Sequence, residues 1–173
     1  MKALIIDTET TGLVEPCVIE MAYQVLDNNL ALTGESFHQR YKPHKPMEWG
    51  AIATHHIIPE DLEGCHFSST CTLPPDTEYL IGHNIDFDWK VLGSPDIKRI
   101  DTVALARSIL PDLDSHKLGA ILYYLFGANE DTRHKLQSAH SAKADVHFCA
   151  LILDNFVKRL KVKNLMELHQ ASE

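Results

Sequence analysis

The pattern of apolar and polar positions divides the first forty residues into three strands. The apolar run Ala3-Leu4-Ile5-Ile6 lies in the first strand, which is predicted over 2–7, and the second strand covers 18–26. Residues 36–41 form the last part of a third strand, and Asp27-Asn28-Asn29 marks the turn between the second and the third. Consecutive strands joined by short turns pair antiparallel. The N-terminal part therefore predicts three antiparallel strands.

Strands and helices alternate in the rest of the chain. Prolines 43, 46 and 59 punctuate a loop-rich stretch that holds a short helix at 49–55, and residues 60–75 are irregular. The later elements are a strand at 79–82, a helix at 87–92, a strand at 97–100, and helices at 102–110, 118–126 and 141–160. An antiparallel start followed by alternating strands and helices predicts an α/β fold, in which a mixed sheet is flanked by helices.

Length and composition are those of a soluble globular protein. The 173 residues predict one domain over 1–173, with 45% hydrophobic and 23% charged residues. Apolar runs fall short of the roughly 20 residues that a membrane span needs, and the N-terminus lacks a signal-peptide pattern. Four scattered cysteines predict reduced thiols in a cytoplasmic protein with no membrane partner. Cys65, His66 and Cys71 could be half of a zinc site, but no second half is visible.

The formal net charge of −8 has the wrong sign for bulk attraction to nucleic acid. This argument weakens if several acids form a metal site, because bound cations invert the local field. Four basic residues lie in and beyond the last turn of the final helix, where they suit the helix dipole better than a nucleic-acid patch. They are Lys158, Arg159, Lys161 and Lys163.

Two acids follow the first apolar run, in the segment Asp7-Thr8-Glu9-Thr10-Thr11-Gly12. Side chains alternate along a strand, so Asp7 and Glu9 project from one face. Adjacent anions repel each other and resist desolvation, whereas a divalent cation between them relieves both effects. Oxygen ligands suit Mg²⁺ or Mn²⁺. Taken alone, the pair is more simply explained as two solvated acids at a strand end.

Two further segments carry similar chemistry. In His83-Asn84-Ile85-Asp86-Phe87-Asp88 a short apolar strand again runs into acids. His140 precedes the last helix, and Asp145 lies in its first turns, where the helix dipole favours a carboxylate. Taken alone, His140 and Asp145 are more simply a cap and a surface acid.

Together, and in this order, the three segments resemble the DEDDh 3′→5′ exonucleases, also called the DnaQ-like family. Residues 7–13 and 18–22 are similar to its first motif and second strand, and residues 100–107 to the segment after its middle motif. Within the family, residues 51–57 and 106–111 most resemble exonuclease X. The resemblance covers nearly the whole chain and implies the ribonuclease-H-like fold.

The resemblance implies a set of catalytic residues. His140 would be the general base, and four acids would bind two Mg²⁺ or Mn²⁺ ions: Asp7, Glu9, Asp88 and Asp145. Phosphodiester cleavage concentrates negative charge on the attacking and leaving oxygens, and two cations about 3.5–4 Å apart stabilise both. A neutral imidazole can take a proton from the attacking water. Asp86 departs from the family pattern, in which the acid follows the Phe, so Asp86 is either solvated or alters metal affinity.

The resemblance further implies a site for the 3′-terminal nucleotide. The matching positions are Thr10, Gly12 and Leu13, with His55 as a weaker candidate. Leu13 is equally well explained as a buried apolar residue. Phosphate contacts are predicted at four basic residues near the third motif, for which a solvated loop is an even alternative: Arg133, His134, Lys135 and Lys143.

The sequence thus predicts a metal-dependent 3′→5′ exonuclease that releases nucleoside 5′-monophosphates from single-stranded DNA or RNA ends, in DNA repair or proofreading. The alternatives are a docking subunit of a polymerase, an RNA-trimming exoribonuclease of the same fold, and an inactive fold that only binds nucleic acid. Few residues follow the last helix, which disfavours the docking subunit, and the full set of catalytic residue types disfavours the inactive fold. The family resemblance is compatible with a homodimer.

Overall fold

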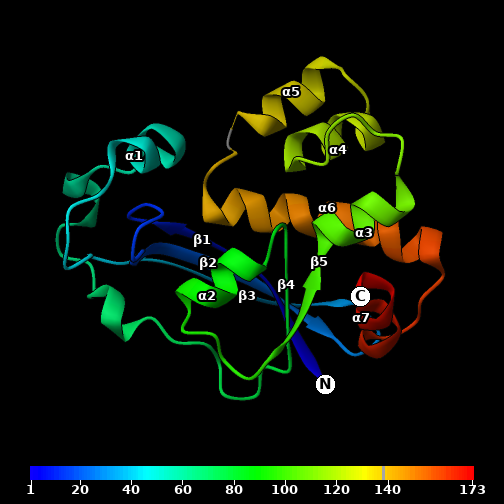
Figure 1. The fold of residues 1–173 in the computed structure, drawn as a ribbon, viewed down its shortest axis with the longest axis horizontal. Helices are drawn as coiled ribbons and strands as arrows, with labels where there is room; N and C mark the ends of the chain where they lie inside the picture. Colours follow the sequence, from blue (N-terminus) through cyan, green and yellow to red (C-terminus); the bar gives the residue numbers. More distant parts are fainter. Residues whose placement is uncertain (138) are drawn as a thin grey trace.

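The computed structural model describes residues 1–137 and 139–173. Its strands are β1 (Lys2–Thr10), β2 (Val18–Asp27), β3 (Leu32–Arg40), β4 (Tyr79–Gly82) and β5 (Lys98–Asp101). They form one sheet in the order β3-β2-β1-β4-β5 (Figure 1). The β3-β2-β1 pairs are antiparallel, and the β1-β4-β5 pairs are parallel. The predicted mixed sheet with three antiparallel strands is confirmed.

Seven α-helices accompany the sheet in the described part of the chain. They are α1 (Trp49–His55), α2 (Asp86–Val91), α3 (Thr102–Ile109), α4 (Leu118–Phe126), α5 (Glu130–Leu136), α6 (Ala142–Leu160) and α7 (Leu165–Ser172). The irregular stretch after α1 holds two short 3₁₀ helices, Pro59–Leu62 and Ser68–Thr70. None of the helices in the described part of the chain combines the length and the apolarity that a membrane span requires.

Helices α5 and α7 were not predicted. Each begins at an asparagine cap: the Asn129 side chain accepts a hydrogen bond from the Thr132 amide, and the Asn164 side chain accepts one from the Glu167 amide. Both helices are short, and α5 is almost entirely polar, so it has no apolar stripe to reveal it. The asparagine at the start of each helix was the feature of the sequence that could have predicted it.

β1 is longer than predicted, and β3 includes a first part that the sequence left undefined. β1 continues past residue 7 because Thr8, Glu9 and Thr10 still pair with β2, with a bulge between Glu9 and Thr10. β3 begins at Leu32, ahead of the predicted last part, and its first positions are exposed because it lies at the edge of the sheet. Exposed edge strands lack the apolar alternation on which the prediction relied.

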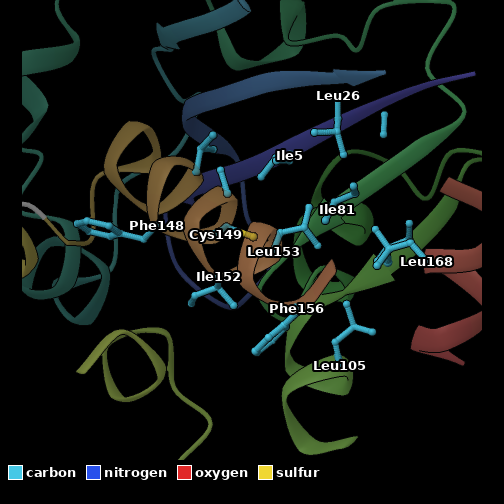
Figure 2. Close-up of a cluster of buried hydrophobic side chains, with 14 of the residues drawn as sticks. Ile5, Leu26, Ile81, Leu105, Phe148, Cys149, Ile152, Leu153, Phe156 and Leu168 are labelled. Atoms are coloured by element: carbon cyan, nitrogen blue, oxygen red, sulfur yellow. The ribbon is translucent and has the colours of Figure 1, made fainter. Parts of the chain in front are cut away.

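The alternation of β1 decides which side chains reach which face of the sheet. Ala3 and Ile5 belong to the apolar cluster under α6, whereas Leu4 and Ile6 belong to the cluster on the opposite face. Figure 2 shows the first cluster, in which Leu153 of α6 lies next to Ile81 of β4. Continuing the alternation places Asp7 and Glu9 on the α6 face, at the end of the core.

Candidate active site

Three acids from two elements meet at the end of this core. Asp7 and Glu9 come from β1, and Asp145 comes from α6, which packs along β1. One carboxylate oxygen from each lies within 4.8 Å of the others. The two-residue period of β1 aligns the first two acids, and the start of α6 supplies the third. The predicted convergence of Asp7, Glu9 and Asp145 is therefore present in the structure.

Asp88 stands beside this cluster rather than within it. It is buried at 5% exposure, and its Oδ1 accepts hydrogen bonds from the Thr8 amide (2.9 Å) and the Thr8 hydroxyl (2.6 Å). Thr8 lies between Asp7 and Glu9, so these bonds tie α2 to the strand that carries both acids. The charge of Asp88 is near enough to raise the pKa of Asp7 and of Glu9.

The four acids lie in an environment that disfavours their charged forms. Burial, followed by the charges of Asp88, Asp145 and Glu9, raises the pKa of Asp7 well above its ordinary value. Burial, followed by the charge of Asp145, raises the pKa of Glu9 to about 8. Burial raises the pKa of Asp88 to about 6 and that of Asp145 to about 6, against the opposing hydrogen bonds from Thr8 and from the His140 amide. A bound divalent cation would relieve the repulsion, so the donor set fits a metal such as Mg²⁺ or Mn²⁺.

Glu20 was missed by the sequence reasoning. It lies on β2 directly opposite Glu9, and only 1% of it is exposed. It accepts hydrogen bonds from His38 Nε2 (3.0 Å), Arg40 Nε (3.0 Å) and the Ala142 amide (2.9 Å). Burial would raise its pKa, but these three bonds outweigh burial and lower it. Glu20 therefore attaches the start of α6, and with it Asp145, to the sheet. The feature of the sequence that could have indicated this role is the presence of a lone acid in the apolar strand 18–26.

His140 is exposed and precedes α6 in a left-handed conformation (φ 66°). Its backbone amide donates to Asp145 Oδ2 at 3.2 Å. Asp145 is thus held by the His140 amide and lies close to Asp7 and Glu9. This arrangement rules out the simpler interpretation of Asp145 as a surface acid. This hydrogen bond uses only the main chain of His140 and does not involve its imidazole.

The four residues predicted to bind the terminal nucleotide line one cavity of about 390 Å³ next to Glu9: Thr10, Gly12, Leu13 and His55. Gly12 has φ 152°, and a Cβ there would lie 2.0 Å from Cδ of Glu48, so the turn requires glycine. Leu13 is 79% exposed, so its interpretation as a buried residue is wrong: the turn after β1 carries it out of the core.

His55 and Glu48 shape this cavity through internal hydrogen bonds. His55 Nε2 donates to the Thr10 carbonyl (3.2 Å) and so ties α1 to β1, while Nδ1 accepts from the Ile57 amide (3.0 Å) just after the helix. Burial lowers the pKa of His55 and favours this neutral form. The Glu48 carboxylate accepts from the amides of Leu13 (3.3 Å) and Val14 (3.2 Å), a long-range contact that the sequence did not indicate.

Comparison with known proteins matches residues 4–153 to the RNase T family of exonucleases. The chain belongs to this exonuclease family. No match was found among curated proteins. Among solved structures, exonuclease X in complex with 5′-overhanging duplex DNA is 21% identical, with a TM-score of 0.77 over 99% of both chains. Escherichia coli exonuclease I bound to single-stranded DNA is 20% identical, with a TM-score of 0.72 over 92% of this chain and 41% of the other.

The fold of this exonuclease is therefore the ribonuclease-H-like fold that the sequence predicted, because both structural matches superpose on nearly all of it. A third similar structure, cell-death related nuclease 4, is 15% identical, with a TM-score of 0.64 over 91% of this chain and 64% of the other. The exonuclease spans less than half of the exonuclease I chain, which extends beyond the shared domain.

Asp86 lies apart from the acid cluster of the exonuclease. Its Oδ1 accepts a hydrogen bond from Arg99 at 2.7 Å, and the side chain is 60% exposed. Arg99 in turn lies over the Trp89 ring, 4.1 Å from its centroid. Asp86 is thus a surface acid in an ion pair, and Asp88 is the acid of this motif that faces Asp7.

Three of the four basic residues predicted to contact phosphate form contacts within α5 or at its end, whereas Lys143 lies exposed on α6. Arg133 pairs with Glu130 (3.0 Å), and Lys135 pairs with Asp131 (2.7 Å). His134 contacts Gln137. Residues three or four apart on a helix meet on its surface, which the prediction did not take into account. Within the described residues, Cys65, His66 and Cys71 form no cluster with the geometry of a metal site.

The raised pKa values of the acids predict how stability depends on pH. A carboxyl with a higher pKa in the folded than in the unfolded chain binds more protons when folded, so its contribution to the free energy of unfolding falls as pH rises. We expect this loss between the ordinary value near 4 and the folded values of about 6 for Asp88 and Asp145 and about 8 for Glu9. Mg²⁺ or Mn²⁺ should therefore raise the melting temperature most at pH 8–9 and little at pH 5.

Thermal melts in EDTA and in Mn²⁺ across this range test the expectation. Glu9→Gln is the matched control, because it removes the group whose pKa is raised to about 8 and should flatten the metal-free profile between pH 6 and 8. Equal melting temperatures with and without metal at pH 8 would contradict the assignment of a cation site.

Proposed function

We propose that this exonuclease removes nucleotides from the 3′ end of single-stranded DNA and releases nucleoside 5′-monophosphates, with Mg²⁺ or Mn²⁺ bound by its acid cluster. The observation that carries the proposal is the meeting of Asp7, Glu9 and Asp145 at the edge of a cavity of about 390 Å³. A cation site next to a cavity of this size fits one terminal nucleotide, and the resemblance to DNA-bound exonucleases supports DNA as the substrate.

Asp7, Glu9, Asp88 and Asp145 would hold two ions, and Asp88 is oriented for this by its two hydrogen bonds from Thr8. Bound cations would neutralise the charge that develops on the attacking and leaving oxygens. Glu20 keeps Asp145 in place through the Ala142 amide. These contacts fix the acids before substrate arrives, which reduces the reorganisation needed during the reaction.

His140 would accept the proton of the attacking water. It lies on the segment before α6, exposed to solvent and next to Asp145, and an imidazole exchanges protons near neutral pH. Its backbone contact with Asp145 keeps the residue at the site while the ring stays available.

The cavity beside Glu9 would receive the terminal nucleoside. Leu13 and Phe87 provide apolar surface for the base, and the Gly12 turn lets the backbone approach closely. The net charge of −8 supports a site directed at chain ends rather than a long duplex-binding channel. We place this activity in DNA repair or proofreading in the cytoplasm.

Digestion of matched oligonucleotides tests the proposal. A 3′-labelled single strand should release labelled nucleoside 5′-monophosphate at once, whereas the same strand labelled at its 5′ end should shorten stepwise. EDTA should stop both reactions. Release of a 5′-terminal mononucleotide first would overturn the polarity, and faster digestion of an RNA strand of the same sequence would assign the RNA-trimming alternative.

The two acids of the middle motif are expected to differ in their effect on the rate. Asp88→Asn should lower single-turnover cleavage by at least about 10²-fold, because it removes a charge that holds the cations at the reacting centre. Asp86→Asn is the matched control: it should leave cleavage within about twofold, since its contact is an exposed ion pair of small energy. The reverse order of effects would show that the ligand position is Asp86.

A further inference from the structure

A large cavity borders the acid cluster on the side of Asp145. It has a volume of about 790 Å³ and lies between α3, the start of α4 and the segment that carries His140. The smaller cavity described above borders the cluster on the side of Glu9 instead. We call the larger one the α3–α4 groove. Figure 1 shows α3 and α4 beside α6.

The charge of the α3–α4 groove is opposite to that of the chain. The chain has a net charge of −8, yet the groove is lined by Arg107, Lys117 and three histidines, with Asp145 as its one acid. Arg107 and Lys117 are both exposed, and neither forms an ion pair within the described part of the chain. They differ in this from Arg133 and Lys135, which are paired on α5.

Two partly buried hydrogen bonds of the neighbouring His116 hold the segment that carries Lys117. His83 Nε2 donates to the His116 carbonyl (2.9 Å), and His116 Nε2 donates to the Leu110 carbonyl (2.9 Å). These bonds hold the 110–117 segment against α3, so Lys117 and Arg107 both face the groove. The floor between them is apolar and includes Val103 and Leu118. Two cations above an apolar floor match a single nucleic-acid strand, which presents phosphates and base or sugar faces together.

We propose that the α3–α4 groove binds the strand on the 5′ side of the scissile phosphate, with Arg107 and Lys117 contacting backbone phosphates. The inference rests on the proposed function: with the terminal nucleotide beside Glu9 and the scissile phosphate at the acids, the strand continues past Asp145. The groove has about twice the volume of the terminal cavity, which leaves room for more than one nucleotide.

Affinity at several salt concentrations tests the groove. Each phosphate contact to a single strand contributes about 0.7 to the slope of log affinity against log salt. For a 5′-fluorescein dodecamer with phosphorothioate linkages, fluorescence anisotropy should show a slope smaller by about 1.4 for R107A/K117A, with affinity weakened several-fold at low salt. The double variant K158A/R159A removes the same charge at the far end of α6 and should keep the wild-type slope.

Substrate length separates this inference from the proposed function. R107A/K117A should raise KM for a dodecamer more than for a dinucleotide, since a dinucleotide has no phosphate beyond the scissile one. If the wild type cleaves 3′ ends but R107A/K117A keeps the wild-type slope and length dependence, the proposed role of the groove alone is overturned. If the wild type does not cleave 3′ ends, the proposed function is overturned. The salt dependence of binding would still show whether the groove contacts the strand. Unchanged melting temperatures verify that both double variants fold.

Discussion

Asp7→Asn should abolish phosphodiester hydrolysis and at the same time stabilise the metal-free protein. Asp7 is repelled by four other acids, and burial together with these charges raises its pKa well above the ordinary value. Replacing the carboxyl by an amide removes this repulsion but also removes a ligand from the cluster. We expect cleavage to fall by at least about 10²–10³-fold, as when a group that stabilises transition-state charge is lost.

The stability gain should appear only without metal. Each kcal/mol of repulsion relieved raises the melting temperature by about 2–4 °C in a chain of this size. In Mn²⁺ the wild type should recover this difference, because the ions stabilise only a site that keeps Asp7. The exposed acid Asp112 provides the control, since Asp112→Asn makes the same charge change away from the cluster. Loss of activity with a lowered melting temperature in EDTA would indicate a structural role for Asp7 instead.

His140→Ala should slow cleavage by about 10²–10⁴-fold, the range typical of a general base, and leave metal affinity nearly unchanged. The cleavage rate and the metal affinity can change independently because Asp145 is held by the backbone amide of His140, which remains when the side chain is replaced. Asp145→Ala should by contrast reduce both the rate and the affinity for Mn²⁺. Calorimetric titration of Mn²⁺ and single-turnover cleavage at saturating metal measure the two effects.

The left-handed backbone at His140 calls for a second variant. Asparagine tolerates φ of 66° better than alanine, so His140→Asn removes the base with less strain. Both variants should lose a similar fraction of the rate, and added imidazole should restore part of it. His147→Ala removes an exposed histidine on α6 and should be neutral. Near wild-type turnover in both His140 variants would show that another group takes the proton.

Periodicity accounts for how much of this site could be predicted from the sequence. The apolar run at residues 3–6 predicted a strand, and the alternation of side chains along a strand placed Asp7 and Glu9 on one face. The observed β1 includes both acids. The cap region before the last helix placed His140 and Asp145 at its start, where the structure has them. These features depend on neighbours in sequence, and short-range rules are reliable for them.

Contacts between distant segments account for most of what could not be predicted. Glu20 acts on the start of α6 across 122 positions, and Glu48 reaches the turn after Gly12 across 35. Neither contact follows from local pattern. The exposure of Leu13 depends on how the turn leaves the sheet, and the ion pairs of Arg133 and Lys135 depend on α5, a helix too polar to be recognised from apolar spacing. The Arg107 and Lys117 groove likewise appears only once α3 and α4 are packed.

Anomalous diffraction from crystals grown with Mn²⁺ and a nucleoside 5′-monophosphate tests the central claim most directly. The account predicts two manganese peaks about 3.5–4 Å apart, bound by Asp7, Glu9, Asp88 and Asp145, with the nucleotide in the cavity beside Glu9. Manganese bound elsewhere, or a nucleotide bound with no metal at these acids, would contradict it.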